Sequence, residues 1–211
     1  MFTGIVRALG AVRSLRKNGG GCELRVDISA LNAEARAAQI GDSIAVNGVC
    51  LSVAELRDGC ARFDISPETL ARCLVGEWRD GARVNLEPAL AAGAPLGGHL
   101  VCGHIDGAGT LLARRDSDGC AWMRFEAPRE LGRLIADKGS LAVDGVSLTT
   151  NDVRDENGAT CFEVMLVPHT LKHTTLGALQ PRARAHLEAD ALARYAQRLL
   201  AGGNDNGGEA R

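Results

Sequence analysis

One eleven-residue stretch occurs twice in this chain, and that repeat constrains the fold more than any other feature. Residues 43–53 read SIAVNGVCLSV and residues 140–150 read SLAVDGVSLTT, so six of the eleven positions are identical. Other motifs recur at offsets of 97 to 101 residues, for example Gly4 with Gly103 and Pro67 with Pro168. A repeat of about a hundred residues has the length of a domain, so the sequence indicates a duplicated domain and not a solenoid of short repeats.

The repeat divides the 211 residues into four units, with the Ala- and Gly-rich segment 89–98 as the linker between the two domains. The predicted units are a first domain at 1–98, a second at 99–189, a helix at 190–203 and a disordered tail at 204–211. Asp190 is placed to cap the helix, on which Leu192, Tyr195 and Leu199 form a narrow apolar stripe. Two interpretations of this stripe stay open: packing on its own domains, or a helix bundle between subunits.

Each repeat has the pattern of short β-strands separated by tight turns. Asn47-Gly48, for example, is a hairpin dipeptide that favours positive φ. Strands are predicted at residues 1–16, 22–28, 43–46, 49–55, 60–65 and 83–87, with helices at 29–40, after the Ser66-Pro67 cap, and at 128–137. Because no strand–helix–strand rhythm appears, the pattern predicts an all-β fold of two small β-barrels and not a doubly wound dinucleotide-binding fold.

Composition excludes several classes of function. A net charge of −2, a pI near 6.2 and 3% aromatic residues give no basis for binding nucleic acid or an anionic membrane. No run approaches the length of a membrane span, and the N-terminus lacks the features of a signal peptide. Seven cysteines without a Cys-x-x-Cys pair are most simply reduced thiols, which predicts a cytoplasmic protein.

A metal site is not expected either. His99 and His104 are five residues apart, which on a strand places them on opposite faces. His169 and His173 have helical spacing, but no third ligand stands near them.

Small polar side chains recur in matching places in the two repeats. Hydroxyls, glycine backbone and a few ionisable groups suit a polyol or a heterocycle that needs many neutral hydrogen bonds. Any one of these residues has a structural alternative: Cys50 as a filler of the core, His104 as a satisfied interior histidine. Their joint recurrence predicts two similar pockets for two similar ligands. The two sets are Thr3, Gly4, Ser43, Cys50, Ser52, Asp64, Glu68 and Thr69, and His104, Lys138, Asp144, Ser147, Thr149, His169 and Thr170.

Four motifs then identify a family. MFTGIV at residues 1–6, GDSIAVNGVCL at 41–51, GGHLVCGHIDG at 97–107 and PHTL at 168–171 closely resemble the riboflavin synthase family, and the resemblance extends over residues 1–200. It implies two six-stranded Greek-key barrels per chain and a homotrimer held by the C-terminal helices. The active site is then expected between the N-terminal barrel of one subunit and the C-terminal barrel of its neighbour. The family has no metal or redox cofactor, and lumazine synthase is a further expected partner.

The resemblance also implies a reaction. Two molecules of 6,7-dimethyl-8-ribityllumazine give riboflavin and 5-amino-6-ribitylaminouracil, as a four-carbon unit passes from one molecule to the other. A base must deprotonate the 7-methyl group of one molecule, and carbon 7 of the other must accept a nucleophile. Bringing both molecules together is an entropy problem that preorganised binding addresses.

The family motifs place substrate-binding residues in both barrels. Those expected in the first pocket are Gly4, Ile5, Val6, Cys50, Leu51, Ser52, Asp64, Ile65, Ser66, Pro67, Glu68 and Thr69. Those expected in the second are Gly103, His104, Ile105, Lys138, Ser147, Leu148, Thr149, Leu166, Val167, Pro168, His169, Thr170 and Leu171. The catalytic candidates are Phe2 at the pocket mouth, Ser43, Cys50 and His104 for proton transfer, and Asp144 and Asp190.

The sequence departs from the family pattern in two places. Ser52 stands where threonine is common, which keeps the hydroxyl. Residues 182–188, RARAHLE, lack the glycine and the Val-Asn pair that are usual before Asp190, whereas residues 83–87, RVNLE, keep Val-Asn in the first repeat.

Three rival functions fit the sequence less well than this prediction. A non-catalytic carrier of a lumazine or flavin is expected to have lost one of the two polar sets, and both are intact here. A flavin-dependent reductase would need a nucleotide-binding domain for which the chain has no room. A structural trimer with empty barrels does not account for the polar sets.

Overall fold

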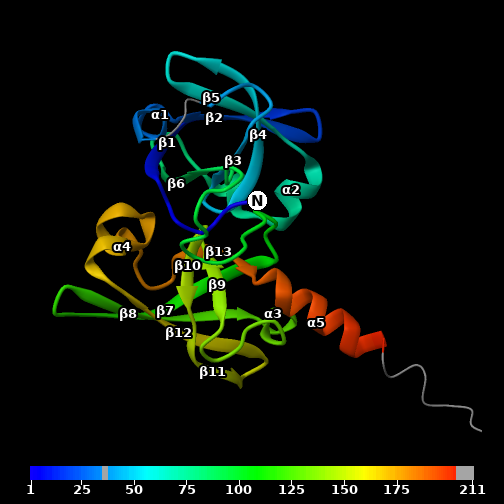
Figure 1. Ribbon diagram of the computed structural model, residues 1–211, viewed down its shortest axis with the longest axis vertical. Helices are drawn as coiled ribbons and strands as arrows, with labels where there is room; N and C mark the ends of the chain where they lie inside the picture. The colour runs from blue at the N-terminus through cyan, green and yellow to red at the C-terminus, as the bar shows by residue number, and fades with distance from the viewer. Residues whose placement is uncertain (35–37, 203–211) are drawn as a thin grey trace, which may run out of the picture.

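The computed structural model describes residues 1–34 and 38–202, and the first repeat forms a closed β-barrel (Figure 1). Its strands are β1 (Ala8–Asn18), β2 (Gly21–Asp27), β3 (Ser43–Val46), β4 (Val49–Arg57), β5 (Cys60–Ile65) and β6 (Arg83–Pro88). All neighbours are antiparallel in the order β1-β2-β5-β4-β3-β6, with β6 returning to β1. Closure leaves no unpaired sheet edge.

The second repeat has the same strand order with one strand interrupted. Its strands are β7 (Gly107–Ser117), β8 (Cys120–Pro128), β9 (Ser140–Val143), β10 (Val146–Thr149), β11 (Asn151–Glu156), β12 (Ala159–Leu166) and β13 (Arg184–Ala189). They form a seven-stranded sheet, β10-β9-β13-β7-β8-β12-β11. Its two ends, β10 and β11, are the halves of one chain segment broken at Thr150. The backbone N–H of Thr150 donates to the Gly139 carbonyl (3.0 Å) and its hydroxyl donates to the Ala136 carbonyl (2.6 Å), so this residue bonds to the turn before β9. The all-β, duplicated fold is confirmed.

The helices are short and connect the strands. They are α1 (Ser29–Glu34), α2 (Pro67–Arg72), α3 (Arg129–Gly132), α4 (Pro168–His173) and α5 (Ala191–Gly202), with 3₁₀ turns η1 (Leu74–Glu77) and η2 (Thr175–Ala178). The helix predicted at 128–137 ends at Gly132, because Leu134 and Ile135 continue with i→i+3 bonds. The helix predicted at 29–40 begins at Ser29 and is helical to Glu34. Residues 35–37 lie outside the described chain, and residues 38–40 are not helical.

Each repeat encloses its own apolar core. In the first, Leu24, Phe63 and Leu86 are fully buried, and in the second Phe125 and Phe162 stack with ring centroids 5.6 Å apart. Buried residues alternate with half-buried ones along β2 and with half-buried or exposed ones along β8, as the two-residue period of a strand requires. Each core is therefore built almost entirely from one repeat, and the other repeat adds only a short segment, with Ile105 on the first core and Val6 on the second.

The repeats meet at two equivalent hairpin turns. Asn47 and Asp144 both have positive φ, 45° and 47°, as the hairpin pattern predicted for the first of them. The glycines that follow them pack back to back, and a Cβ on Gly48 would lie 2.8 Å from the Gly145 nitrogen. Only glycine fits at either position, since the obstacle is backbone that cannot move aside.

A hydrogen-bonded network joins the same turns to the strands behind them. The side chains of Asn47 and Asp144 accept the backbone N–H groups of Asn85 (2.6 Å) and His186 (2.8 Å) respectively. Burial raises the pKa of Asp144 to about 7 and lowers the pKa of His186 to about 4, so both groups favour their neutral forms. Asp144 is thus a structural residue of the junction.

His186 spans the junction as Asn85 does. Asn85 donates from Nδ2 to the Asp144 carbonyl (2.9 Å) and accepts the first N–H of η2 at 2.8 Å. His186 donates from Nδ1 to the Asn47 carbonyl (2.8 Å) and accepts the first N–H of η1 at Nε2, 2.7 Å. A neutral imidazole offers one donor and one acceptor, as one edge of a carboxamide does. The departure at residues 182–188 therefore preserves the bonding of the usual asparagine.

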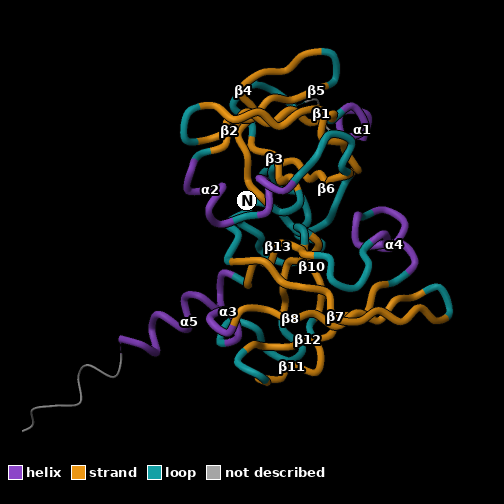
Figure 2. Tube along the Cα trace, turned by 180° about the vertical axis from the view of Figure 1, so that it is seen from behind, coloured by secondary structure: helices purple, strands orange, loops and turns teal. Residues whose placement is uncertain are grey.

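Helix α5 projects from the second repeat into solvent (Figures 1 and 2). Its apolar residues Leu192, Tyr195, Leu199 and Leu200 are 68 to 77% exposed, so the stripe is not packed on the chain's own barrels. Asp190 caps the helix by accepting the Leu192 N–H at 2.9 Å, as predicted. Within residues 1–34 and 38–202 no helix is long and apolar enough to cross a bilayer. The predicted tail at 204–211 lies outside the described residues.

Candidate functional site

Two extended segments leave their own repeat and dock on the other. We call residues 2–6 the first arm and residues 101–105 the second arm. They pair with each other where the repeats meet: Phe2 and Val101 form an antiparallel bridge with N–H···O distances of 2.6 and 3.1 Å. Phe2 is fully buried there among Ala45, Val101 and Ala142. The sequence placed Phe2 at a pocket mouth, and that placement is wrong because the bridge draws the ring into the junction.

Each arm then reaches the repeat to which it does not belong. The Gly103 carbonyl accepts the Cys50 N–H at 2.9 Å, and the Gly4 carbonyl accepts the Ser147 N–H at 2.8 Å. Ile105 packs on the first core and Val6 on the second. The sequence-based grouping, which put each arm with its own repeat, is therefore wrong. Strand periodicity cannot reveal such an exchange, because it describes local structure only.

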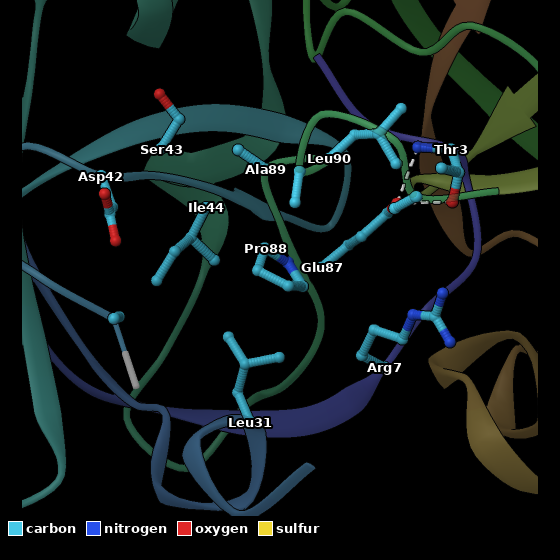
Figure 3. Close-up of a pocket in the computed structure, with 13 residues that line it drawn as sticks. Thr3, Arg7, Leu31, Asp42, Ser43, Ile44, Glu87, Pro88, Ala89 and Leu90 are labelled. Atoms are coloured by element: carbon cyan, nitrogen blue, oxygen red, sulfur yellow. Dashed lines mark hydrogen bonds between the residues drawn. The ribbon is translucent and has the colours of Figure 1, made fainter. Parts of the chain in front are cut away.

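Two buried glutamates anchor the arms. Glu87 accepts the Thr3 N–H and hydroxyl, each at 2.7 Å (Figure 3). It also accepts the Gly4 N–H at 3.0 Å. Glu188 accepts the N–H groups of Cys102 and Gly103 at 2.7 and 2.9 Å. Burial raises both pKa values, that of Glu188 to about 7. Neither glutamate was among the predicted site residues, because their link to the arms exists only in the tertiary structure.

The second arm and the first repeat together enclose a cavity of 360 Å³. Its lining is Val49, Cys50, Glu68, Thr69, Arg72, Cys73, Gly103, His104 and Ile105. Six of these nine were predicted as binding residues, and the arm exchange is what brings His104 to Cys50. Val49, Arg72 and Cys73 were missed, and for the last two a signal existed. Their helical spacing of four from Glu68 and Thr69 was the available signal, and Arg72 pairs with Glu68 at 2.9 Å.

Local sequence explains how α2 presents its residues. The Ser66 hydroxyl accepts the Thr69 N–H at 3.1 Å, and Pro67 occupies the first turn, so the predicted cap is confirmed. Other predicted residues of this repeat lie elsewhere: Leu51 and Ile65 are buried in the barrel core. Asp64 and Ser52 are exposed, and Asp64 pairs with Arg62.

In the second repeat, Ser147 occupies the place that Cys50 has in the first. It contacts the first arm, to which the predicted residues Gly4, Ile5 and Val6 belong. Its neighbours differ from those of the first repeat. Val167 stands where Ser66 caps α2, so α4 has no side-chain cap at that residue. His169 replaces Glu68 and stacks on His173 at 4.1 Å. The remaining predicted residues divide by exposure: Leu166 is buried, Leu148, Thr170 and Leu171 are half-buried, and Lys138, Thr149 and Pro168 are exposed.

Ser43 lies in a different cavity from Cys50. This cavity of 360 Å³ is also lined by Asp42, Thr3, Arg7 and Glu87, so it lies beside the first arm at Thr3 (Figure 3). Ser43 pairs with Ser52 in the β3–β4 ladder, two positions away from the Cys50 pair. The structure thus groups Cys50 with His104 in one cavity and places Ser43 in another. Phe2 lies beneath the first of these groups, in the buried cluster against which Cys50 packs.

Among the residues that the structure describes, no group of three or more His, Cys, Asp or Glu side chains is arranged to hold a metal ion. His104 is exposed on the second arm, whereas His99 is buried.

Replacement of Glu188 by glutamine tests the anchoring of the second arm. The amide retains one acceptor, so one of the two arm N–H groups loses its partner, and kcat/KM for the proposed reaction below is expected to fall about tenfold. Because the pKa of Glu188 is near 7, wild-type activity should rise as pH rises through 7, when the carboxylate accepts both N–H groups; E188Q should lack this rise. The matched control is E77Q, at an exposed ion pair with Arg184. An unchanged rate and pH profile in E188Q would contradict the anchoring role.

Comparison with known proteins matches both repeats to one family. The model of the lumazine binding domain fits residues 3–89 and again 102–190. Riboflavin synthase of Mycobacterium bovis is 43% identical over 95% of this chain and 98% of that protein, and that of Actinobacillus pleuropneumoniae is 36% identical over 95% and 90%. The crystal structure of LumP complexed with 6,7-dimethyl-8-(1'-D-ribityl)lumazine has a TM-score of 0.77 at 21% identity, covering 90% of this chain and 99% of that one, which shows a shared fold. The chain therefore belongs to the riboflavin synthase family, whose two repeats are lumazine-binding domains.

Proposed function

We propose that this protein is a riboflavin synthase that converts two molecules of 6,7-dimethyl-8-ribityllumazine into riboflavin and 5-amino-6-ribitylaminouracil. One molecule supplies a four-carbon unit to the other, so the atoms of the two substrates equal those of the two products and no external oxidant is needed. The observation that carries the proposal is the cavity in which Cys50 and Thr69 of the first repeat face His104 of the second arm.

The cavity has the chemistry that the reaction requires. The Thr69 hydroxyl and the side chains of Glu68 and Arg72 suit hydrogen bonding to a pteridine ring, and the apolar side chains of Val49 and Ile105 suit its faces. His104 is exposed and Cys50 half-buried, so both are accessible to a ligand. An imidazole and a thiol are able to move the proton of the 7-methyl group. In this proposal His104 and Cys50 are the proton-handling pair.

The two ligands must also be brought together. Each repeat is proposed to hold one lumazine, and the exposed stripe of α5 is proposed to pack against two further copies in a homotrimer, so that unlike repeats of neighbouring chains face each other. Light scattering should report three chains per particle, and replacement of Leu192 and Leu199 by serine should yield monomers. A cytoplasmic location and an association with lumazine synthase belong to the same proposal.

Incubation of the purified protein with the lumazine alone, followed by riboflavin absorbance, tests the activity. Substitutions C50A and H104A are expected to lower turnover by about two to four orders of magnitude, because general acid–base groups contribute on this scale. His104 is exposed, so the thermal midpoint of H104A should change little. Cys50 packs against the apolar cluster of Phe2, Ala45, Val101 and Ala142, so C50A should also lose some stability. Unchanged rates in both variants would remove the pair from the mechanism.

A non-catalytic carrier is the second candidate. It would bind lumazine without forming riboflavin, and LumP is a neighbour in fold. The higher identity to riboflavin synthases, 32 to 43% over nearly the whole chain, favours the enzyme. One bound ligand per chain without turnover would favour the carrier.

A further inference from the structure

One buried histidine is not used by the proposed mechanism. His99 is 7% exposed and lies in the segment that joins the two repeats. Its backbone N–H bonds to the Thr3 carbonyl at 3.1 Å, so the segment is held against the first arm. Its Nδ1 lies 2.7 Å from the Ser147 hydroxyl, while Nε2 is buried without a hydrogen-bond partner in the described chain.

Glycine makes this approach possible. A Cβ on Gly98 would lie 2.2 Å from the Thr3 carbonyl oxygen and 2.8 Å from the Ser147 Cβ. A side chain there would lift the segment away from Ser147, since one of the two obstacles is backbone. The Gly97-Gly98-His99 motif therefore serves to deliver the imidazole to one hydroxyl.

The missing partner of Nε2 indicates which atom is the donor in the bond between His99 Nδ1 and the Ser147 hydroxyl. A buried N–H group without an acceptor is rarer in proteins than an acceptor without a donor, so the proton resides on Nδ1. Burial lowers the pKa of His99, against a raising effect of Asp190, and the ring is accordingly neutral. Nδ1–H then donates to the Ser147 oxygen, and the serine's own proton is free to point elsewhere.

We propose that His99 is a positioning residue of the second-repeat site, where it orients the Ser147 hydroxyl as a hydrogen-bond donor to the bound lumazine. The acceptor of this hydrogen bond is a carbonyl oxygen or a ring nitrogen of the pteridine. This inference rests on the proposed function. At the matching place the first repeat has Cys50, and a thiol is a much weaker hydrogen-bonding group. The lumazine sites of the two repeats thus differ chemically. Such a difference is required because one of the two identical substrate molecules donates the four-carbon unit and the other accepts it.

Two polar substitutions of His99 separate this role from packing. Asparagine places its amide near the position of Nδ1 and is able to donate to Ser147, whereas the amide of glutamine reaches the position of Nε2 and is not. We expect H99Q to weaken lumazine binding, followed by fluorescence titration, and to raise KM about tenfold. H99N should stay within threefold of wild type, and kcat should change less than KM in both.

A double-mutant cycle tests whether His99 acts through Ser147. S147A alone should weaken binding as H99Q does, and the double variant S147A/H99Q should be no worse than S147A. Additive losses, or equal losses in H99N and H99Q, would overturn the proposal. Thermal midpoints of all four variants establish that they are folded. If wild-type protein binds lumazine but forms no riboflavin, the enzyme proposal fails, while the binding pattern still decides the role of His99.

Discussion

Gly103→Ala is expected to disable the candidate site and to destabilise the fold by about 2 to 5 kcal/mol. Gly103 has φ +81°, and a Cβ there would lie 2.5 Å from the Cys50 Cβ and 2.8 Å from the Cys50 nitrogen. The first effect is backbone strain, and the second is a collision with a strand that cannot move aside. The second arm would be pushed away from Cys50 and would take His104 with it.

A displacement of about 1 Å at a reacting group costs about a hundredfold in rate, so kcat/KM for riboflavin formation should fall at least that far. The matched control is Gly158→Ala. Gly158 also has φ +81°, but a Cβ there would meet nothing within 4 Å. The G158A variant should lose only about 1 to 2 kcal/mol of unfolding free energy, from backbone strain, and should keep near-normal turnover. Chemical denaturation and steady-state rates measure both effects. If G103A loses no more stability or activity than G158A, the close approach of arm and strand is not what the protein needs.

Removal of the His186 imidazole should produce the second large effect. In H186A the Asn47 carbonyl and the first N–H of η1 lose their partners inside the junction, and a cavity remains. Each unsatisfied buried group costs about 1 to 3 kcal/mol, so we expect a total loss of about 3 to 5 kcal/mol. H186N should recover more than half of it, because Asn85 makes the equivalent pair of bonds in the first repeat.

The same residue gives a pH dependence with a definite sign. The folded-state pKa of His186 is about 4, below the unfolded value near 6.5, so its contribution is complete above pH 6.5 and is lost as pH falls from 6.5 toward 4. The loss amounts to about 3 kcal/mol over that window. Thermal melts of wild type and H186N at pH 7 and pH 5 isolate the effect, since the other buried acids are common to both. Equal acid sensitivity in the two proteins would show that the imidazole is not the responsible group.

The sequence predicted the local structure of the first repeat well where turn chemistry was strong. The Asn47-Gly48 hairpin, the Ser66 cap and the strand Cys60–Ile65 were all expected, because each depends on residues adjacent in the chain. The helix at 128–137 was overestimated. Its apolar spacing was correct, and Leu131 and Ile135 are buried, but the same spacing is met by a short helix followed by turns.

The candidate site could be predicted only in part. The motifs identified Cys50, Thr69 and His104 as site residues, but they assigned His104 to the wrong barrel. They also named Phe2 and Asp144, and both side chains are buried where the repeats meet. Contacts across about a hundred residues leave no periodic trace in a single sequence.

By itself, the sequence determined that this protein is a duplicated all-β chain of a lumazine-binding family, because duplication, strand alternation and turn residues are properties of order along the chain. Only the tertiary structure decided which groups share a site. The arms cross because Phe2 pairs with Val101 and because the Gly4 and Gly103 carbonyls accept N–H groups of the opposite repeat, from Ser147 and Cys50 respectively. Those bonds exist only after both barrels have formed, and they are what brings an imidazole from one repeat to a thiol of the other.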